Sequence, residues 1–163
     1  MFKLPRRDNM PRLIFCADGS IFAALALRYN IEYGCQVPNA APVYPIAFAD
    51  QDWKNPNRAA YMNALQKYKP DMATVLDFER PEQFDEVMSW AEEAAQHVRE
   101  TVIIIPKFKG SIEMLPEQVK GKKVVLGYSV PTSFGGTPLP ISAFGRRPVH
   151  LLGGSPQKQM ELT

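Results

Sequence analysis

The feature of this sequence that most constrains its fold is the alternation of apolar, β-rich segments with segments of helical pattern. Runs such as VIIIP and KVVLGY are almost continuously apolar, as in strands that are covered on both faces. Strands that alternate with helices predict a parallel sheet, so the expected fold class is α/β. The predicted strands span residues 13–17, 43–49, 72–78, 101–106, 123–128 and 149–152.

Three of the intervening segments have helical patterns with recognisable starts. Ser20 is predicted to cap a helix through IFAALALRY, and Asn57 to cap RAAYMNALQKY, which Pro70 would end. The pattern from Pro81 to Val98 opens with a proline in its first turn and carries an apolar stripe at helical spacing. The stripe consists of Phe84, Val87, Met88, Ala91, Ala94, Ala95 and Val98.

The number of strand-helix units limits how the sheet closes. Right-handed crossovers leave either a barrel or an open doubly wound sheet. An eightfold barrel needs roughly 200–250 residues, whereas this chain has 163 residues. We therefore expect repeated βα units in a TIM-barrel-like arrangement that is partial or truncated. Because an incomplete barrel leaves open sheet edges, a homo-oligomer or a partner chain is one way to complete it.

The composition predicts one domain at residues 13–163, preceded by a flexible arm at residues 1–12. The net charge of +2 neither favours nor excludes nucleic acid. No run approaches the ~18 apolar residues of a membrane span, and the arm lacks the apolar stretch of a signal peptide. A cytoplasmic protein without membrane contact is expected. Cys16 lies in an apolar run and Cys35 in a predicted turn, which gives no zinc-ligand spacing, so neither metal nor cofactor is expected.

Polar residues directly follow most of the predicted strands. In parallel α/β folds these positions share the carboxyl edge of the sheet, where ligands bind. Asp77 ends the strand MATVLD, where packing rarely needs a carboxylate, so a functional role is favoured. For Asp18 and Asp50, turn formation and helix capping are open alternatives. A helix start likewise explains Glu79, and a solvated basic loop explains Lys107.

Two glycine-rich segments lie near the end of the chain. Gly153 and Gly154 follow the last predicted strand and precede Ser155, which can cap a helix. Backbone N–H groups in such a turn can approach a phosphate, although a plain tight turn explains the same residues. The segment 131–140 is rich in Gly and Pro, which is typical of a binding loop or lid, or of a rigid structural arm.

Six unusual blocks occur in order along the chain: FADQDWKNPNRAAYMNAL, MATVLDFE, WAEEAAQ, IIIPKFKG, LGYSVPTSFGGT and RPVHLLGGSP. Together they resemble phage-encoded proteins described as queuine tRNA-ribosyltransferase-like, which are relatives of the tRNA- and DNA-guanine transglycosylases. The resemblance covers about residues 43–160. It implies exchange of guanine for a 7-deazaguanine base in phage DNA or tRNA, in the cytoplasm of the host cell.

The resemblance also implies roles for individual residues. An aspartate nucleophile attacks the ribose C1′, a second aspartate manages protons, and the target nucleotide leaves its stack. Asp77 and Asp50 are favoured for this chemistry, with Asp18 next, and Tyr128 or Phe134 for stacking on a base. Substrate binding is assigned to Asp52, Glu79, Lys107, Tyr128, Phe134, Gly135 and Gly136, and phosphate binding to Gly153, Gly154 and Ser155.

Two hypotheses from other classes accompany the transglycosylase. One is a non-catalytic nucleotide- or protein-binding module on a partial barrel scaffold, whose binding would survive replacement of Asp77 or Asp50. The other is a barrel enzyme for a small phosphorylated substrate, whose phosphate-dependent binding would be lost on altering Gly154.

Overall fold

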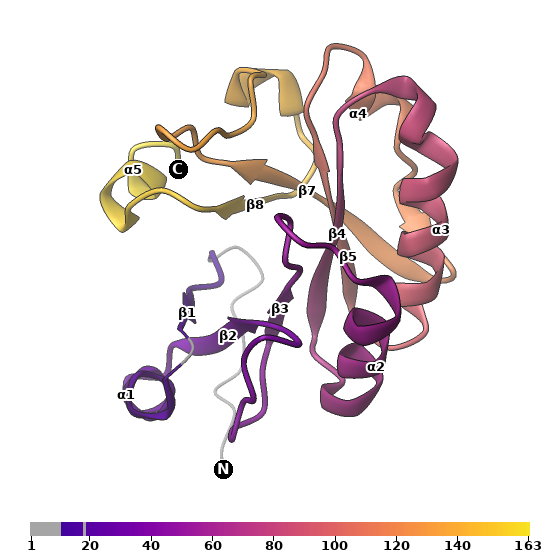
Figure 1. Ribbon diagram of the computed structural model, residues 1–163. Coiled ribbons are helices and arrows are strands. Elements are labelled where there is room, and N and C mark those ends of the chain that lie inside the picture. The colour runs from indigo at the N-terminus through magenta and orange to yellow at the C-terminus, as the bar shows by residue number, and fades with distance from the viewer. Residues whose placement is uncertain (1–10, 18) are drawn as a thin grey trace.

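The computed structural model describes residues 11–17 and 19–163 and shows a curled, mostly parallel sheet that forms a half-barrel (Figure 1). Within these residues, seven parallel strands follow one another in sequence order, and β6 (Gln118–Val119) pairs antiparallel with β7. This order agrees with the predicted α/β class and partial closure. The parallel strands are β1 (Ile14–Cys16), β2 (Glu32–Gln36), β3 (Phe48–Asp50), β4 (Met72–Phe78), β5 (Thr101–Pro106), β7 (Lys122–Ser129) and β8 (Val149–Leu152).

The helices lie mainly on the outer side of the curled sheet (Figure 1). The Asn57 cap is confirmed, because its side chain accepts a hydrogen bond from the Ala60 N–H. The Ser20 cap is wrong: Gly19, with an extended backbone, is the N-cap, and Ser20 is the first helical residue. The helices are α1 (Ser20–Arg28), α2 (Arg58–Tyr68), η1 (Pro81–Gln83), α3 (Phe84–Ala95), α4 (Ser111–Met114), η2 (Ile141–Phe144) and α5 (Pro156–Met160).

The predicted strands at 72–78, 101–106 and 149–152 are confirmed with their bounds, but two predictions fail. The run 43–49 forms a strand only from Phe48, because Pro42 and Pro45 interrupt the backbone donors before it. The strand β2 was missed, since EYGCQ mixes polar residues with glycine and Cys35 was placed in a turn. Cys35 instead lies buried in β2, which pairs with both β1 and β3.

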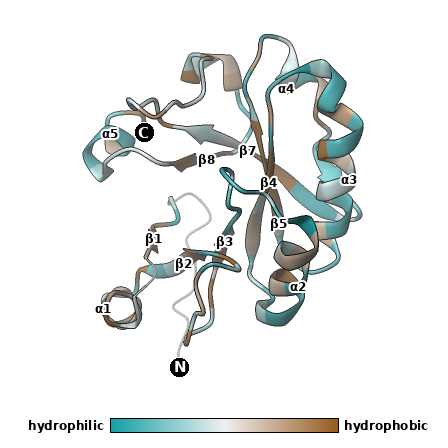
Figure 2. Cartoon of the chain, in the orientation of Figure 1, coloured by the Kyte–Doolittle hydropathy of each residue, from teal (hydrophilic) through white to brown (hydrophobic). Residues whose placement is uncertain are grey.

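The larger core, the outer core, lies between the outer face of the sheet and the helices. Val87, Ala91, Ala94 and Ala95 of the predicted α3 stripe are buried there, and Trp90 joins them although it stands outside that stripe. Figure 2 shows hydrophilic colour on much of the outward-facing surface of α3. Burial on one side and solvent on the other explain the period of this helix.

The inner, concave face of the sheet carries a second, smaller apolar cluster. Phe48, Met72 and Ile103 are buried in it, and Ile14 and Val125 pack against them. His150 of β8 stacks on Phe48 with ring centroids 4.8 Å apart. Burial in this cluster lowers the pKa of His150 to about 4.

Strand β4 contains one more residue than its partner between two paired positions. Thr74 pairs with Ile103 and Asp77 pairs with Ile105, so three steps on β4 match two on β5. The two intervening side chains, Val75 and Leu76, both pack into the outer core. The extra residue breaks the alternation of the strand and returns Asp77 to the inner face, the face of Thr74.

The amino edge of the sheet is held by charged groups. The Arg12 guanidinium bonds to carboxylate oxygens of Glu32 at 2.7 Å, Glu100 at 3.0 Å and Asp71 at 3.1 Å. Asp71 also accepts from the Arg99 Nε at 2.8 Å. These contacts connect the starts of β2, β4 and β5. The predicted arm lies mostly outside the described residues, but Arg12 at its end belongs to the folded structure.

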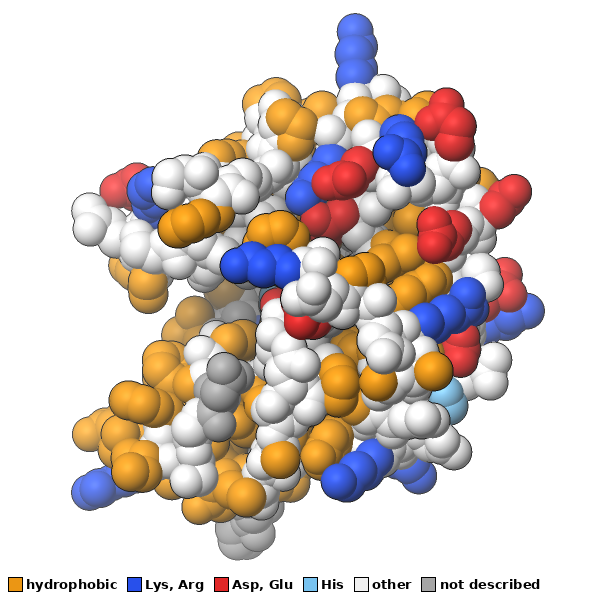
Figure 3. All heavy atoms as spheres, in the orientation of Figure 1, with side chains coloured by type: hydrophobic (Ala, Val, Ile, Leu, Met, Phe, Trp, Pro, Cys, Tyr) orange, Lys and Arg blue, Asp and Glu red, His pale blue; other side chains and the backbone are white. Residues whose placement is uncertain are grey.

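The parallel run ends at β1 on one side and at β8 on the other. Figure 3 shows hydrophobic side chains gathered over the region of β1 and α1. A partner that completes the barrel stays a prediction. The exposed apolar residues of the β1 and α1 region are Leu13, Phe15, Ile21, Phe22, Leu25 and Tyr29.

No helix in the described part of the chain is long and apolar enough to cross a membrane.

We expect His150→Phe to stabilise the protein selectively in acid. A histidine with a lowered pKa contributes stability above its ordinary pKa near 6.5, and that contribution is lost as the pH falls towards 4. The unfolding free energy of the variant minus that of the wild type should therefore be about 2 kcal/mol larger at pH 5 than at pH 8. Urea unfolding at both pH values measures this, and an equal difference at both would contradict the assignment.

Candidate functional site

Asp50 lies at the carboxyl end of β3, where its carboxylate is held by neutral donors. Its Oδ1 accepts hydrogen bonds from the Thr74 Oγ1 at 2.9 Å and from the Gln51 backbone N–H at 3.0 Å. Burial raises the pKa of Asp50 to about 6, although both hydrogen bonds favour the ionised form. Thr74 was not foreseen, because a threonine inside an apolar strand gives no sequence signal.

Asp77 lies on the next strand and is paired with a cation. The Lys107 Nζ is 2.5 Å from the Asp77 Oδ2 and 3.8 Å from the Glu79 Oε1. The Asp77 and Lys107 side chains are only 20% and 18% exposed. Burial raises the pKa of Asp77, and the Lys107 ammonium opposes that rise. The structure thus brings together Asp77, Lys107 and Glu79, three of the predicted site residues.

The two carboxylates influence each other at this edge of the sheet. The negative charge of Asp77 raises the pKa of Asp50, in addition to the effect of burial. Asp50 has neutral hydrogen-bond donors, whereas Asp77 has an ammonium partner. These environments suit Asp50 for carrying a proton and Asp77 for remaining ionised.

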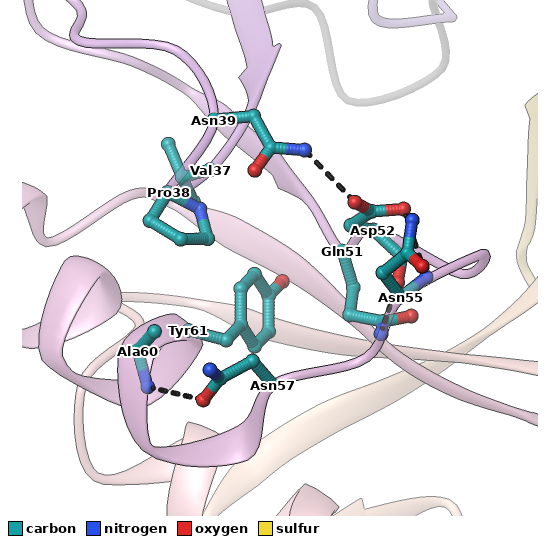
Figure 4. A pocket seen from close by; sticks show the side chains of 9 residues that line it. All are labelled: Val37, Pro38, Asn39, Gln51, Asp52, Asn55, Asn57, Ala60 and Tyr61. Carbon is teal, nitrogen blue, oxygen red and sulfur yellow. Dashed lines mark hydrogen bonds between the residues drawn. The ribbon is translucent and has the colours of Figure 1, made fainter.

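A pocket of about 230 Å³ lies behind the loop that follows β3. Figure 4 shows the Tyr61 ring of α2 and the amides of Gln51 and Asn57 around it. The Tyr61 hydroxyl donates to the Thr74 carbonyl at 2.7 Å, so the tyrosine fixes the strand ends beneath the candidate site. The remaining lining residues are Val37, Pro38, Asn39, Asp52, Asn55 and Ala60.

Asp52 has a different position from Asp50. Its Oδ2 accepts from the Asn39 side chain at 2.9 Å, and its Oδ1 accepts from the backbone N–H groups of Lys54 and Asn55. The Asn39 hydrogen bond is the main cause that lowers the pKa of Asp52. Asp52 therefore organises the loop after β3, and it lines two surface hollows.

Phe134 is 86% exposed and lies in the loop after β7. It lines a groove of about 430 Å³ together with Trp53, which is 56% exposed. Gly135 and Gly136 have φ angles of +118° and +151°, and a Cβ on Gly136 would lie 2.5 Å from the Pro131 Cα. These glycines shape the loop. Trp53 was not among the predicted site residues, so its place in the groove was missed.

One predicted site residue does not join the site, and another lies outside the described residues. Tyr128 is wrong as a substrate contact, because its ring is 5% exposed and packs edge-on against Phe144 in the outer core. The continuous apolar run KVVLGY hid the alternation that turns Tyr128 away from the inner face. Asp18 lies outside the described residues.

The glycine turn after β8 has the form of a capped helix start. Gly153 and Gly154 have φ angles of +70° and +65°, and the Ser155 hydroxyl accepts from the Lys158 N–H at 3.3 Å. These contacts support the tight-turn interpretation, and phosphate binding here stays a prediction. Among the described residues, no group of three or more His, Cys, Asp or Glu side chains is arranged to hold a metal ion.

Comparison with known proteins gives a family but no activity. The profile of a family of unknown function (DUF6610) matches residues 26–163. No curated protein and no solved structure matches the chain. The matched region includes Asp50, Asp77 and the loops that surround them.

We expect Asp50→Asn to change how stability depends on pH. A carboxyl with a raised pKa contributes stability below its ordinary pKa near 4, and loses it as the pH rises through about 6. The amide keeps an oxygen for Thr74 and Gln51 but does not ionise. The unfolding free energy of the variant minus that of the wild type should rise by roughly 2–3 kcal/mol from pH 4 to pH 7. Asp85→Asn, on the exposed start of α3, is the control; a flat difference for Asp50→Asn would refute the assignment.

Proposed function

The chain belongs to the DUF6610 family of unknown function, and we propose that it exchanges a nucleobase in DNA or tRNA as guanine transglycosylases do. The observation that carries the proposal is the pair of carboxyls, Asp50 and Asp77. The irregularity of β4 turns Asp77 to the inner face, and the charge of Asp77 raises the pKa of Asp50. The six sequence blocks that resemble queuine tRNA-ribosyltransferase-like proteins support the same reaction class. Sequential parallel strands support a partial TIM-barrel-like scaffold, with active groups at the carboxyl edge.

In the first half of the proposed reaction, Asp77 is the nucleophile. Lys107 contacts the Oδ2 of Asp77, so the other oxygen, Oδ1, attacks the ribose C1′. The bond from C1′ to guanine N9 breaks, and its electron pair leaves with the base. The protonated Asp50 carboxyl donates its proton to the departing guanine. A ribosyl ester of Asp77 and an ionised Asp50 result.

The second half restores both carboxyls. The N9 atom of an incoming 7-deazaguanine attacks C1′, and the ester bond to Asp77 breaks with its electron pair returning to the carboxylate. The incoming base gives its proton to Asp50. Lys107 is 3.8 Å from Glu79 as well as beside Asp77, so it can move between the two carboxylates as the charge on Asp77 changes.

Labelled guanine or 7-deazaguanine, offered with DNA and with tRNA, tests this function directly. Wild type should incorporate label into one polymer, and Asp77→Ala and Asp77→Asn should each reduce incorporation by about 10³-fold or more, because neither forms the ester. Asp85→Asn serves as the matched carboxylate control, and unfolding curves show that each variant remains folded. Incorporation that survives in Asp77→Ala would remove Asp77 from the mechanism.

A second candidate function is non-catalytic nucleotide binding. It is favoured by the contact of the Lys107 ammonium with the Asp77 Oδ2, because an ion pair makes this carboxylate a weaker nucleophile. It predicts that folded wild type incorporates label into neither polymer yet still binds nucleotide. That binding would persist in Asp77→Asn and Asp50→Asn.

A further inference from the structure

The groove between the loops after β3 and β7 is separate from the carboxylate pair. Gln36, Asp52, Trp53, Lys54, Asn55 and Phe134 line it. We propose that this groove binds an unpaired base of a single-stranded nucleic acid between the rings of Trp53 and Phe134. The identification of the ligand as nucleic acid rests on the proposed function, and the inference adds that the substrate is recognised as a single strand.

Phe134 is presented by a rigid turn. The Thr132 N–H donates to the Gly135 carbonyl at 2.8 Å, and the Gly135 N–H donates back to the Thr132 carbonyl at 3.2 Å. The Phe134 N–H donates to the Thr132 hydroxyl at 3.2 Å. An aromatic ring held in solvent by a fixed turn loses little conformational entropy when a ligand stacks on it.

Trp53 is presented by a loop that Asp52 organises. The two Asp52 oxygens accept three hydrogen bonds, from Asn39, Lys54 and Asn55. These bonds fix the backbone on the C-terminal side of Trp53 and leave its ring exposed.

The chemistry of the groove fits a base with its phosphate. Every base has an aromatic face, so two exposed rings bind a base without regard to sequence. The Lys54 Nζ lies 5.3 Å from the centre of the Trp53 ring, which places a cation beside the stacking surface. The Gln36 amide bonds to Asn39 and to the Gln51 carbonyl, and each of its two ends keeps one further hydrogen bond to make with a base edge. A base inside a duplex is already stacked on both sides and has no free face for these rings.

Trp53 fluorescence tests the inference on the intact chain. The protein has two tryptophans, and Trp90 is 5% exposed, so Trp90→Phe leaves Trp53 as the single reporter. Single-stranded oligonucleotides of about 12 residues, as DNA and as RNA, should quench it, and the same sequences as duplexes should bind at least about tenfold more weakly. Unmodified wild type, in which the buried Trp90 adds a constant background, repeats the titration if Trp90→Phe is destabilised.

The partner ring provides the matched comparison. Phe134→Ala should weaken single-strand binding about tenfold, whereas Phe134→Tyr should preserve it, because the second ring is lost only in the first variant. Tyr29→Ala removes another exposed aromatic, at the end of α1, and should leave binding unchanged. Quenching by a proline-rich peptide but not by oligonucleotides, or equal binding of duplex and single strand, would overturn the inference.

The two proposals fail differently. Oligonucleotide quenching that persists in Asp77→Asn, with no base exchange by wild type, would retain the groove and remove the proposed reaction. Base exchange by a wild type that shows no quenching would retain the proposed reaction and remove the groove as a binding site for single strands.

Discussion

The extra residue in β4 is the constraint on which the geometry of the candidate site depends. A regular strand would direct Leu76 to the concave face and Asp77 to the outer core. The register shift between Thr74 and Asp77 reverses this, so that two successive apolar side chains pack beneath the helices. The carboxylate then shares the inner face with Thr74, the partner of Asp50. The same register shift therefore packs Val75 and Leu76 into the outer core and directs Asp77 to the inner face.

The two edges of the sheet use charge in different ways. At the amino edge, Arg12 and Arg99 bind acidic residues on neighbouring strand starts, and these contacts hold the strands in place. At the carboxyl edge, the hydrogen-bond donors that Asp50 has within the described residues are neutral, and burial raises its pKa to about 6. Asp77 faces Lys107 instead. The half-barrel therefore places stabilising ion pairs at one edge and titratable carboxyls at the other.

The loops at the carboxyl edge are organised by their own side chains. Asp52 orders the loop after β3, and Thr132 orders the turn after β7. Both loops expose an aromatic ring, Trp53 and Phe134, into one groove. Because rigid supports hold these rings, the groove exists before any ligand arrives, and the same order positions the backbone around Asp50.

The sequence by itself determined the α/β class, the strands at 72–78, 101–106 and 149–152, and the position of Asp50 and Asp77 at strand ends. Apolar runs and helical spacing carry that information locally. Tertiary structure decided the half-barrel curl and the burial of Tyr128. It also decided β2, since EYGCQ is a strand only through pairing on both sides. The face of Asp77 was decided there too, because register against β5 is a property of two strands and is written in neither one alone.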